Sequence, residues 1–241
     1  MQKIVGKILK ANEEFKMFEK GDRIAVGVSG GKDSLILLEG LCRIRKFLNF
    51  GIELIAITID LSFSDKEEQY KSMKQICNYY GVLYIIEKTE IFDIVFNVKK
   101  QEKNPCSLCS KLKKGVLNTI AKENGCNKVA FGHHLDDVVE TFLMNLFIEG
   151  RIACFSPITF FSRQNLYLIR PLIFAQERQI KRAIKDLNFE VSKILCPKDG
   201  YTYREKIKEF LREKEKEDKG FKKRIFGALR RSGISGWGFK N

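Results

Sequence analysis

Ser29-Gly30-Gly31-Lys32-Asp33-Ser34 separates two apolar runs, residues 24–28 and 35–38. The first run is typical of a buried strand and the second of the start of a helix. A glycine-rich turn between them lets backbone N–H groups face an anion, and the positive end of the helix dipole favours negative charge at the same place. The segment therefore predicts a loop that binds phosphate.

This loop is not a Walker A motif, which has four residues between its first glycine and its Gly-Lys pair, followed by Ser or Thr. Only three residues separate Gly27 from Gly31, and Asp33 follows Lys32. A carboxylate beside phosphates is repulsive unless a cation lies between them, so Asp33 indicates bound Mg²⁺. A glycine turn without any ligand is the plainer alternative, but the flanking strand and helix favour the phosphate loop.

The six residues resemble the PP-loop of the N-type ATP pyrophosphatases. The resemblance implies an enzyme that cleaves ATP between its α and β phosphates, adenylates a carbonyl-type oxygen and releases pyrophosphate. By itself it says little about the substrate, because the family includes synthetases of GMP, NAD, lysidine and thiolated nucleosides.

Strands and helices alternate along most of the chain. Expected strands cover residues 24–28, 52–59, 82–86, 128–131 and 166–170, and expected helices cover residues 1–19, 65–80, 109–124, 135–148 and 176–187. This order predicts an α/β fold with a Rossmann-like, doubly wound parallel sheet of the PP-loop ATPase type. Ligands bind beyond the carboxyl ends of such strands, so the phosphate loop, Asp60 and Gly132-His133-His134 are expected to meet in one cleft.

The chain divides into three predicted segments. Residues 1–20 form an amphipathic helix, residues 21–196 the ATP pyrophosphatase domain, and residues 197–241 a basic helical extension whose tail, 232–241, is expected to be mobile. The sequence has no apolar run of about 18 residues and no apolar signal-peptide core at its start. We therefore expect a cytoplasmic protein without a membrane partner.

The formal net charge is +14, and residues 198–241 hold 14 basic and 7 acidic residues. This excess indicates an anionic partner larger than ATP, and nucleic acid is the partner that we expect. A basic protein without such a partner is the alternative that charge alone leaves open.

Two cysteines, Cys106 and Cys109, are spaced so that both sulfurs can reach one metal ion. We place them just before a helix, whose dipole stabilises thiolates. A structural zinc site normally has four protein ligands, and no second Cys-x-x-Cys or His pair is present. A redox pair is a second alternative, and an iron–sulfur cluster completed by the distant Cys196 is a third.

The combination of motifs is more specific. Pro105-Cys106-Ser107-Leu108-Cys109-Ser110-Lys111-Leu112, the run Gly132-His133-His134-Leu135-Asp136-Asp137-Val138-Val139-Glu140-Thr141, Arg170-Pro171-Leu172 and the late Cys196 resemble the tRNA 2-thiocytidine synthetases (TtcA type), over roughly residues 23–211. The resemblance implies thiolation of a cytidine in the tRNA anticodon loop, of the position 32 type, and a homodimer. It also implies a 4Fe–4S cluster on Cys106, Cys109 and Cys196, and a sulfur donor such as a cysteine desulfurase or sulfide. The chain departs from the family where Asp199 replaces a frequent second late cysteine.

The predicted site residues follow from these motifs. Residues expected to bind ATP are Ser29, Gly30, Gly31, Lys32, Ser34, Asp60, Gly132 and His134, and the residues expected to act in catalysis are Lys32, Asp33, His133 and Asp137. Lys32 stabilises charge on the separating phosphates, and Asp33 with Asp137 binds Mg²⁺. The N-cap of the helix after His134 is an alternative role for Asp136.

Two other functions fit parts of the sequence. One is a sulfur-free, ATP-dependent synthetase similar to lysidine synthetase, in which the cysteines are structural. The other is a metal- or redox-responsive RNA-binding protein on a fold that no longer uses ATP. The intact loop and the His-His-x-Asp-Asp run favour an enzyme over this last alternative.

Overall fold

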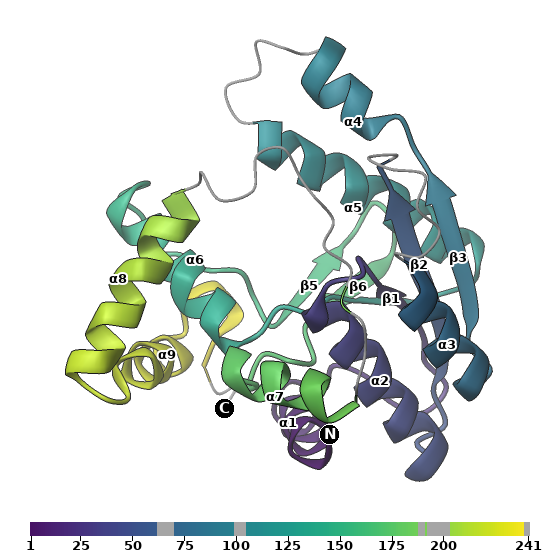
Figure 1. Ribbon diagram of the computed structural model, residues 1–241, viewed down its shortest axis with the longest axis horizontal. Helices are drawn as coiled ribbons and strands as arrows, with labels where there is room; N and C mark the ends of the chain where they lie inside the picture. The colour runs from purple at the N-terminus through teal and green to yellow at the C-terminus, as the bar shows by residue number, and fades with distance from the viewer. Residues whose placement is uncertain (62–69, 99–104, 188–190, 192–202, 239–241) are drawn as a thin grey trace.

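The computed structural model describes residues 1–61, 70–98, 105–187, 191 and 203–238. Within these ranges the strands form a six-stranded sheet in the order β3-β2-β1-β4-β6-β5 (Figure 1). The strands are β1 (Arg23–Gly27), β2 (Glu53–Asp60), β3 (Leu83–Lys88), β4 (Lys128–Ala130), β5 (Ile158–Phe161) and β6 (Leu166–Ile169). The first four and β6 run parallel, which confirms the predicted α/β fold.

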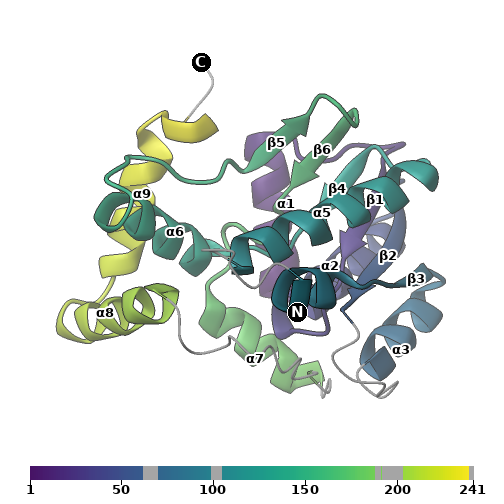
Figure 2. The same ribbon diagram turned by 90° about the horizontal axis from the view of Figure 1, so that it is seen from above.

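Helices cover both faces of the sheet. They are α1 (Gln2–Phe15), α2 (Lys32–Phe47), α3 (Lys71–Tyr80), α4 (Ile91–Asp93), η2 (Ile94–Val98), α5 (Pro105–Glu123), α6 (Leu135–Phe147), α7 (Glu177–Leu187), α8 (Tyr203–Glu217), α9 (Phe221–Arg231) and η3 (Ile234–Gly236). Side chains of α5 pack on one face of the sheet, and those of α1, α2, α3 and α7 belong to the core on the other. Figure 1 shows α5 on one side of the strands and α2 and α7 on the other, and Figure 2 shows α8 and α9 at the far side of the molecule from β2 and β3.

The strand β1 shows how the sequence produces two cores. Successive side chains of a strand point to opposite faces. Ala25 contributes to the core under α5, whereas Ile24 and Val26 contribute to the core under α2. A strand buried on both faces reads as a continuous apolar run, as expected for the centre of a parallel sheet.

The helices α6, α8 and α9 pack together at one side of the sheet (Figure 1). Ile207 and Leu211 of α8 and Phe226 and Leu229 of α9 are buried in the same apolar core as Val139 of α6. The charged sequence after residue 203 is therefore a folded helical pair with one apolar stripe on each helix.

Two expectations about local structure need correction. The helix that carries the cysteines begins at Pro105, not at Cys109, because proline is well suited to the first helical position. The strand β5 was not expected, and it pairs antiparallel with β6 at the edge of an otherwise parallel sheet. The turn between them ends at Asn165, whose φ of 51° lies in the left-handed region.

The tail that was expected to be mobile, residues 232–241, is folded up to residue 238. Trp237 is only 2% exposed. Its ring lies 5.5 Å from that of Phe226 and 5.9 Å from that of Phe15, and its indole N–H donates to the Phe155 carbonyl over 2.9 Å. This residue fixes the chain end to α1 and α9, and residues 239–241 lie outside the description.

Within the described ranges, every helix is too short or too polar to span a lipid bilayer. The division into segments 1–20, 21–196 and 197–241 stays a prediction, and its second boundary lies outside the described residues.

Candidate active site

The loop between β1 and α2 has the geometry expected of a phosphate cradle. Gly30 has a φ of 80°, which glycine adopts without strain, and Gly31 is the N-cap of α2. The Ser34 hydroxyl accepts the Ser29 N–H over 3.1 Å and donates to the Gly31 carbonyl over 2.9 Å. The first N–H groups of α2 are therefore held at a helix N-terminus that faces the carboxyl edge of the sheet.

A cavity of about 430 Å³ lies at this edge, beyond the ends of β1, β2 and β4. Eight of the predicted site residues line it, namely Ser29, Asp33, Ser34, Asp60, Cys109, Gly132, His133 and Asp137. The three points of the sequence that were expected to meet in one cleft therefore do so. Gly30, Gly31, Lys32, His134 and Cys106 lie outside the cavity lining, and Cys196 lies outside the described residues.

Gly132 permits close contact between two loops. A Cβ atom at this position would lie 3.0 Å from the carbonyl carbon and oxygen of Asp33 and 3.2 Å from the Ser34 nitrogen. Any side chain would push the loop after β4 away from the start of α2. The structure thus gives Gly132 a packing role in shaping the cavity.

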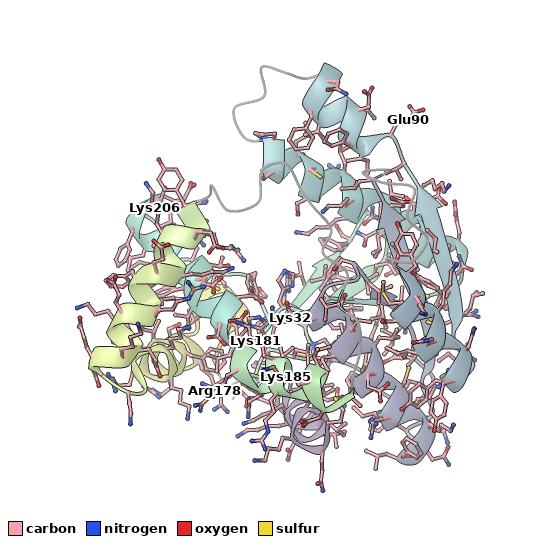
Figure 3. The ribbon with its side chains drawn as sticks, viewed as in Figure 1. Lys32, Glu90, Arg178, Lys181, Lys185 and Lys206 are labelled. Atoms are coloured by element: carbon pink, nitrogen blue, oxygen red, sulfur yellow. The ribbon has the colours of Figure 1, made fainter. Side chains whose placement is uncertain are left out.

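Lys32 is held by carboxylates. Its ammonium lies 2.9 Å from Asp33 and 3.2 Å from Glu177 at the start of α7, and Figure 3 shows it beside that helix. Burial alone would lower the pKa of Lys32, but these two carboxylates outweigh burial and raise it. Burial would raise the pKa of Glu177, yet Lys181 and Lys32 lower it to about 2, so both groups are charged at neutral pH.

His134 is the N-cap of α6 and forms a capping box with Asp137. The Asp137 carboxylate accepts the His134 N–H over 2.9 Å, and the Asp137 N–H donates to His134 Nδ1 over 3.4 Å. The other ring nitrogen, Nε2, lies 3.5 Å from the Asp33 carboxylate. His134, 4% exposed, therefore stands between the two carboxylates predicted to bind Mg²⁺.

Asp136 is not the N-cap. Its carboxylate accepts the Glu177 N–H over 2.7 Å and pairs with Lys222 of α9 over 2.9 Å. It joins the starts of α6 and α7 to the C-terminal helix pair, so its role is structural.

Asp33 has a carboxylate oxygen that is available to bind a cation. Its Oδ1 atom is buried and has no hydrogen-bond partner among the described residues. A buried carboxylate oxygen without a partner is costly, and a divalent cation would satisfy it. Asp33 thus fits the predicted Mg²⁺ site. The Asp137 carboxylate lines the same cavity, but it already accepts the His134 N–H and pairs with Arg204 over 3.5 Å.

His133 lines the cavity between two phenylalanines, its ring 5.9 Å from that of Phe131 and 5.1 Å from that of Phe155. Burial, with the charges of Arg170 and Lys114, lowers the pKa of His133 to about 3. The imidazole is therefore neutral at physiological pH and contributes no positive charge to the cavity.

Two lysines that the sequence did not place in the site, Lys113 and Lys114, line the cavity from α5. Burial and the neighbouring cations Arg170 and Lys113 lower the pKa of Lys114. The sequence could have indicated their position, because they follow Cys109 by four and five residues and so lie about one turn farther along the same helix. Positive charge opposite the phosphate loop suits a polyanionic ligand.

Cys109 lines the cavity and is 8% exposed, whereas Cys106 is exposed one turn earlier in α5.

Asp60 also lines the cavity, and its carboxylate accepts a hydrogen bond from the Tyr70 hydroxyl. Burial of Tyr70, together with this hydrogen bond, raises the pKa of Tyr70.

The phosphate loop, the paired carboxylates and the parallel sheet agree with a family comparison, in which a PP-loop domain matches residues 2–192. This chain belongs to the PP-loop family. It is 36% identical to a tRNA-cytidine(32) 2-sulfurtransferase of Geobacter metallireducens over 230 residues, which cover 95% of this chain and 89% of the relative. A protein of the same name from Citrifermentans bemidjiense is 35% identical over 94% of this chain and 89% of its own length.

Among solved structures, the chain is similar to the U34-tRNA thiolase NcsA from Methanococcus maripaludis, described with its [4Fe-4S] cluster. The TM-score is 0.75 at 24% identity, and the match covers 92% of this chain and 76% of that one. At this identity the likeness concerns the fold.

Proposed function

We propose that this PP-loop enzyme is an ATP-dependent tRNA thiolase that converts cytidine 32 of the anticodon loop into 2-thiocytidine. The proposal is supported by the relatives named tRNA-cytidine(32) 2-sulfurtransferase, which match this chain over nearly its whole length. We also propose that the reaction takes place in the cytoplasm. We further propose a homodimer, which sedimentation of the purified protein tests.

One observation carries the proposal beyond ATP chemistry: Cys109 and the phosphate loop line the same cavity. A synthetase that transfers no sulfur has no need of a thiol in its ATP cavity. Sulfur transfer needs this neighbourhood, because the sulfur must reach the carbon that ATP has activated.

The proposed chemistry has two steps. The C2 oxygen of cytosine attacks the α-phosphorus of ATP, and the α–β bond breaks with release of pyrophosphate. A sulfide nucleophile then attacks C2, and the C2–O bond breaks with AMP as the leaving group. Activation turns an oxygen that leaves poorly into a stable phosphate ester, which divides one difficult substitution into two easier ones.

The residues divide this work. The α2 N-terminus and the Ser29 hydroxyl bind phosphate oxygens, and Lys32 offsets the charge that develops as pyrophosphate leaves. The Ser34 hydroxyl, bonded to the Ser29 N–H and the Gly31 carbonyl, keeps the loop in shape. Asp33 and Asp137 would hold Mg²⁺, which would offset the negative charge of the phosphates. Neutral His133 orients phosphate or base by hydrogen bonding.

Cys106, Cys109 and Cys196 are the proposed thiolate ligands of a 4Fe–4S cluster. Cys106 and Cys109 fit this set, because residues three apart on a helix face the same way and both lie in the first two turns of α5. Among the described residues no group of three His, Cys, Asp or Glu side chains forms a metal site, so a third ligand from elsewhere is required. A cluster bound by these thiolates would supply a thiophilic site for sulfide.

The test combines metal analysis with a thiolation assay. Protein purified without oxygen is expected to contain about four irons and to absorb broadly in the visible range. With unmodified tRNA, ATP, Mg²⁺ and sulfide it is expected to form 2-thiocytidine, detected by mass spectrometry of digested nucleosides. A cysteine desulfurase with cysteine is the second donor to be tried.

The control variants separate ligand cysteines from core cysteines. Cys109→Ser and Cys196→Ser are expected to lose thiolation and keep ATP binding, whereas Cys77→Ala, in the buried face of α3, is expected to keep both. Thiolation that survives in Cys109→Ser contradicts the cluster assignment. ATP consumption with a sulfur-free tRNA product supports the synthetase alternative.

A further inference from the structure

The helix α7 has one apolar face and one strongly basic face. Ile180 and Ala183 are buried, and Ile184 and Leu187 continue the same stripe. Four basic side chains, all exposed, occupy the opposite side at spacings of three, four and seven residues: Arg178, Lys181, Arg182 and Lys185. Residues with these spacings share one face of a helix.

This basic face is poorly neutralised. Lys181 pairs with Glu177 over 3.1 Å, and Arg178 donates to the Gln176 side chain over 3.1 Å. Within the described part of the chain, no carboxylate forms an ion pair with Arg178, Arg182 or Lys185. Adjacent unpaired cations repel one another, and a polyanion on this surface would relieve that repulsion.

The position of the face ties it to the active site. Glu177, the first residue of α7, contacts both Lys32 of the phosphate loop and Lys181 of the basic face. The Glu177 carboxylate therefore connects the phosphate loop to the start of the basic face. Figure 3 shows Arg178, Lys181 and Lys185 along α7, with Lys32 next to the helix.

We propose that the basic face of α7, formed by Arg178, Lys181, Arg182 and Lys185, binds the phosphate backbone of the tRNA beside the base that enters the cavity. The inference rests on the proposed function. It names a docking surface other than residues 198–241, whose excess of basic residues indicated a nucleic-acid partner. A base that is turned out of an anticodon loop keeps its flanking phosphates at the mouth of the pocket, where a row of guanidinium and ammonium groups fits them.

The test removes three of these charges together. The variant Arg178→Gln, Arg182→Gln, Lys185→Gln keeps Lys181, so the contacts of Glu177 and Lys32 stay intact. The matched control, Lys71→Gln, Lys74→Gln, Lys122→Gln, removes the same charge from exposed positions on α3 and α5. The probe is an unmodified tRNA transcript, titrated at several KCl concentrations.

Loss of three phosphate contacts is expected to reduce the slope of log Kd against log salt by about 2 to 3 and to weaken binding at least about tenfold at 0.15 M salt. The control variant is expected to bind like the wild type. Thermal midpoint and Mg·ATP affinity, measured on the same samples, are expected to be unchanged in both variants because every substituted side chain is exposed.

Two results overturn the inference and are distinguishable. If the α7 variant loses no more affinity or salt slope than the control while the wild type binds and thiolates tRNA, the α7 surface is wrong and the proposed function stands. If the wild type binds no tRNA at any salt concentration, the proposed function fails as well.

Discussion

Lys32 of the phosphate loop and Glu177 of α7 form an ion pair of 3.2 Å, although 144 residues separate them in the sequence. The same carboxylate lies 3.1 Å from Lys181. Because Asp136 of α6 accepts the Glu177 N–H over 2.7 Å, the start of α7 is fixed against α6. The Glu177 side chain is thereby held next to Lys32. Glu177 is therefore placed to position Lys32, the lysine proposed to act on the phosphates.

The variant Glu177→Gln tests this role. The amide keeps the shape of the side chain and the backbone bond to Asp136 but loses the charge that orients Lys32. We expect kcat for pyrophosphate release to fall about tenfold, as for the loss of one charged hydrogen bond of roughly 1.5 kcal/mol. Single-turnover assays with saturating tRNA measure this change.

Asp186→Asn is the matched control, because it removes one carboxylate from an exposed position of the same helix. Its kcat is expected to equal that of the wild type. Equal rates for Glu177→Gln and Asp186→Asn would show that Lys32 needs no support from α7. A lower thermal midpoint in Glu177→Gln alone would assign its effect to folding.

Gly132→Ala tests the close approach of the two loops. The added methyl group would lie 3.0 Å from the Asp33 backbone, which cannot withdraw as a flexible side chain can. We expect a loss of about 1–3 kcal/mol in the free energy of unfolding and weaker Mg·ATP binding. Gly115→Ala, in the middle of α5 with no atom within 4 Å of the new methyl, is expected to stabilise by about 0.5–1 kcal/mol. A tolerated Gly132→Ala would refute the packing role.

Trp237→Ala tests the anchoring of the chain end. The indole is buried against Phe15 and Phe226, so its removal leaves a large cavity and an unpaired Phe155 carbonyl. The expected cost is about 3–5 kcal/mol, measured by urea unfolding. Phe160→Ala, at a side chain that is 49% exposed on β5, is expected to cost much less. A small effect of Trp237→Ala would restore the expectation of a mobile tail.

The sequence predicted the arrangement of the sheet because the rules involved are local or topological. An apolar run with a glycine loop after it specifies β1 and α2, and parallel strands bring Ser29, Asp60 and Gly132 to one edge regardless of loop detail. No such local or topological rule predicts the edge strand β5. Its four residues lie in a segment of mixed composition, and only pairing with β6 makes them a strand.

The sequence predicted the site residues that lie within motifs, but not the contacts that depend on how the helices pack. Ser29, Asp33, His133, Asp137 and Cys109 carry their signal in the local pattern, and they line the cavity. The partnership of Lys32 with Glu177, and the positions of Lys113 and Lys114 in the cavity wall, depend on how α7 and α5 pack, which no local pattern encodes. Their assigned roles stay predictions.

His133 offers a test through acid stability. Burial and neighbouring cations hold the pKa of His133 at about 3 in the folded protein, against about 6.5 in an unfolded chain. The unfolded state therefore binds more protons between these values, and stability falls as pH drops below 6.5. His133→Asn removes this contribution, so between pH 7 and pH 5 the variant is expected to lose about 2 kcal/mol less than the wild type, from 1.4 kcal/mol per pH unit. Urea unfolding at both pH values measures the difference. Parallel losses in the two proteins would mean that His133 titrates normally and is able to act as a cation at the phosphates.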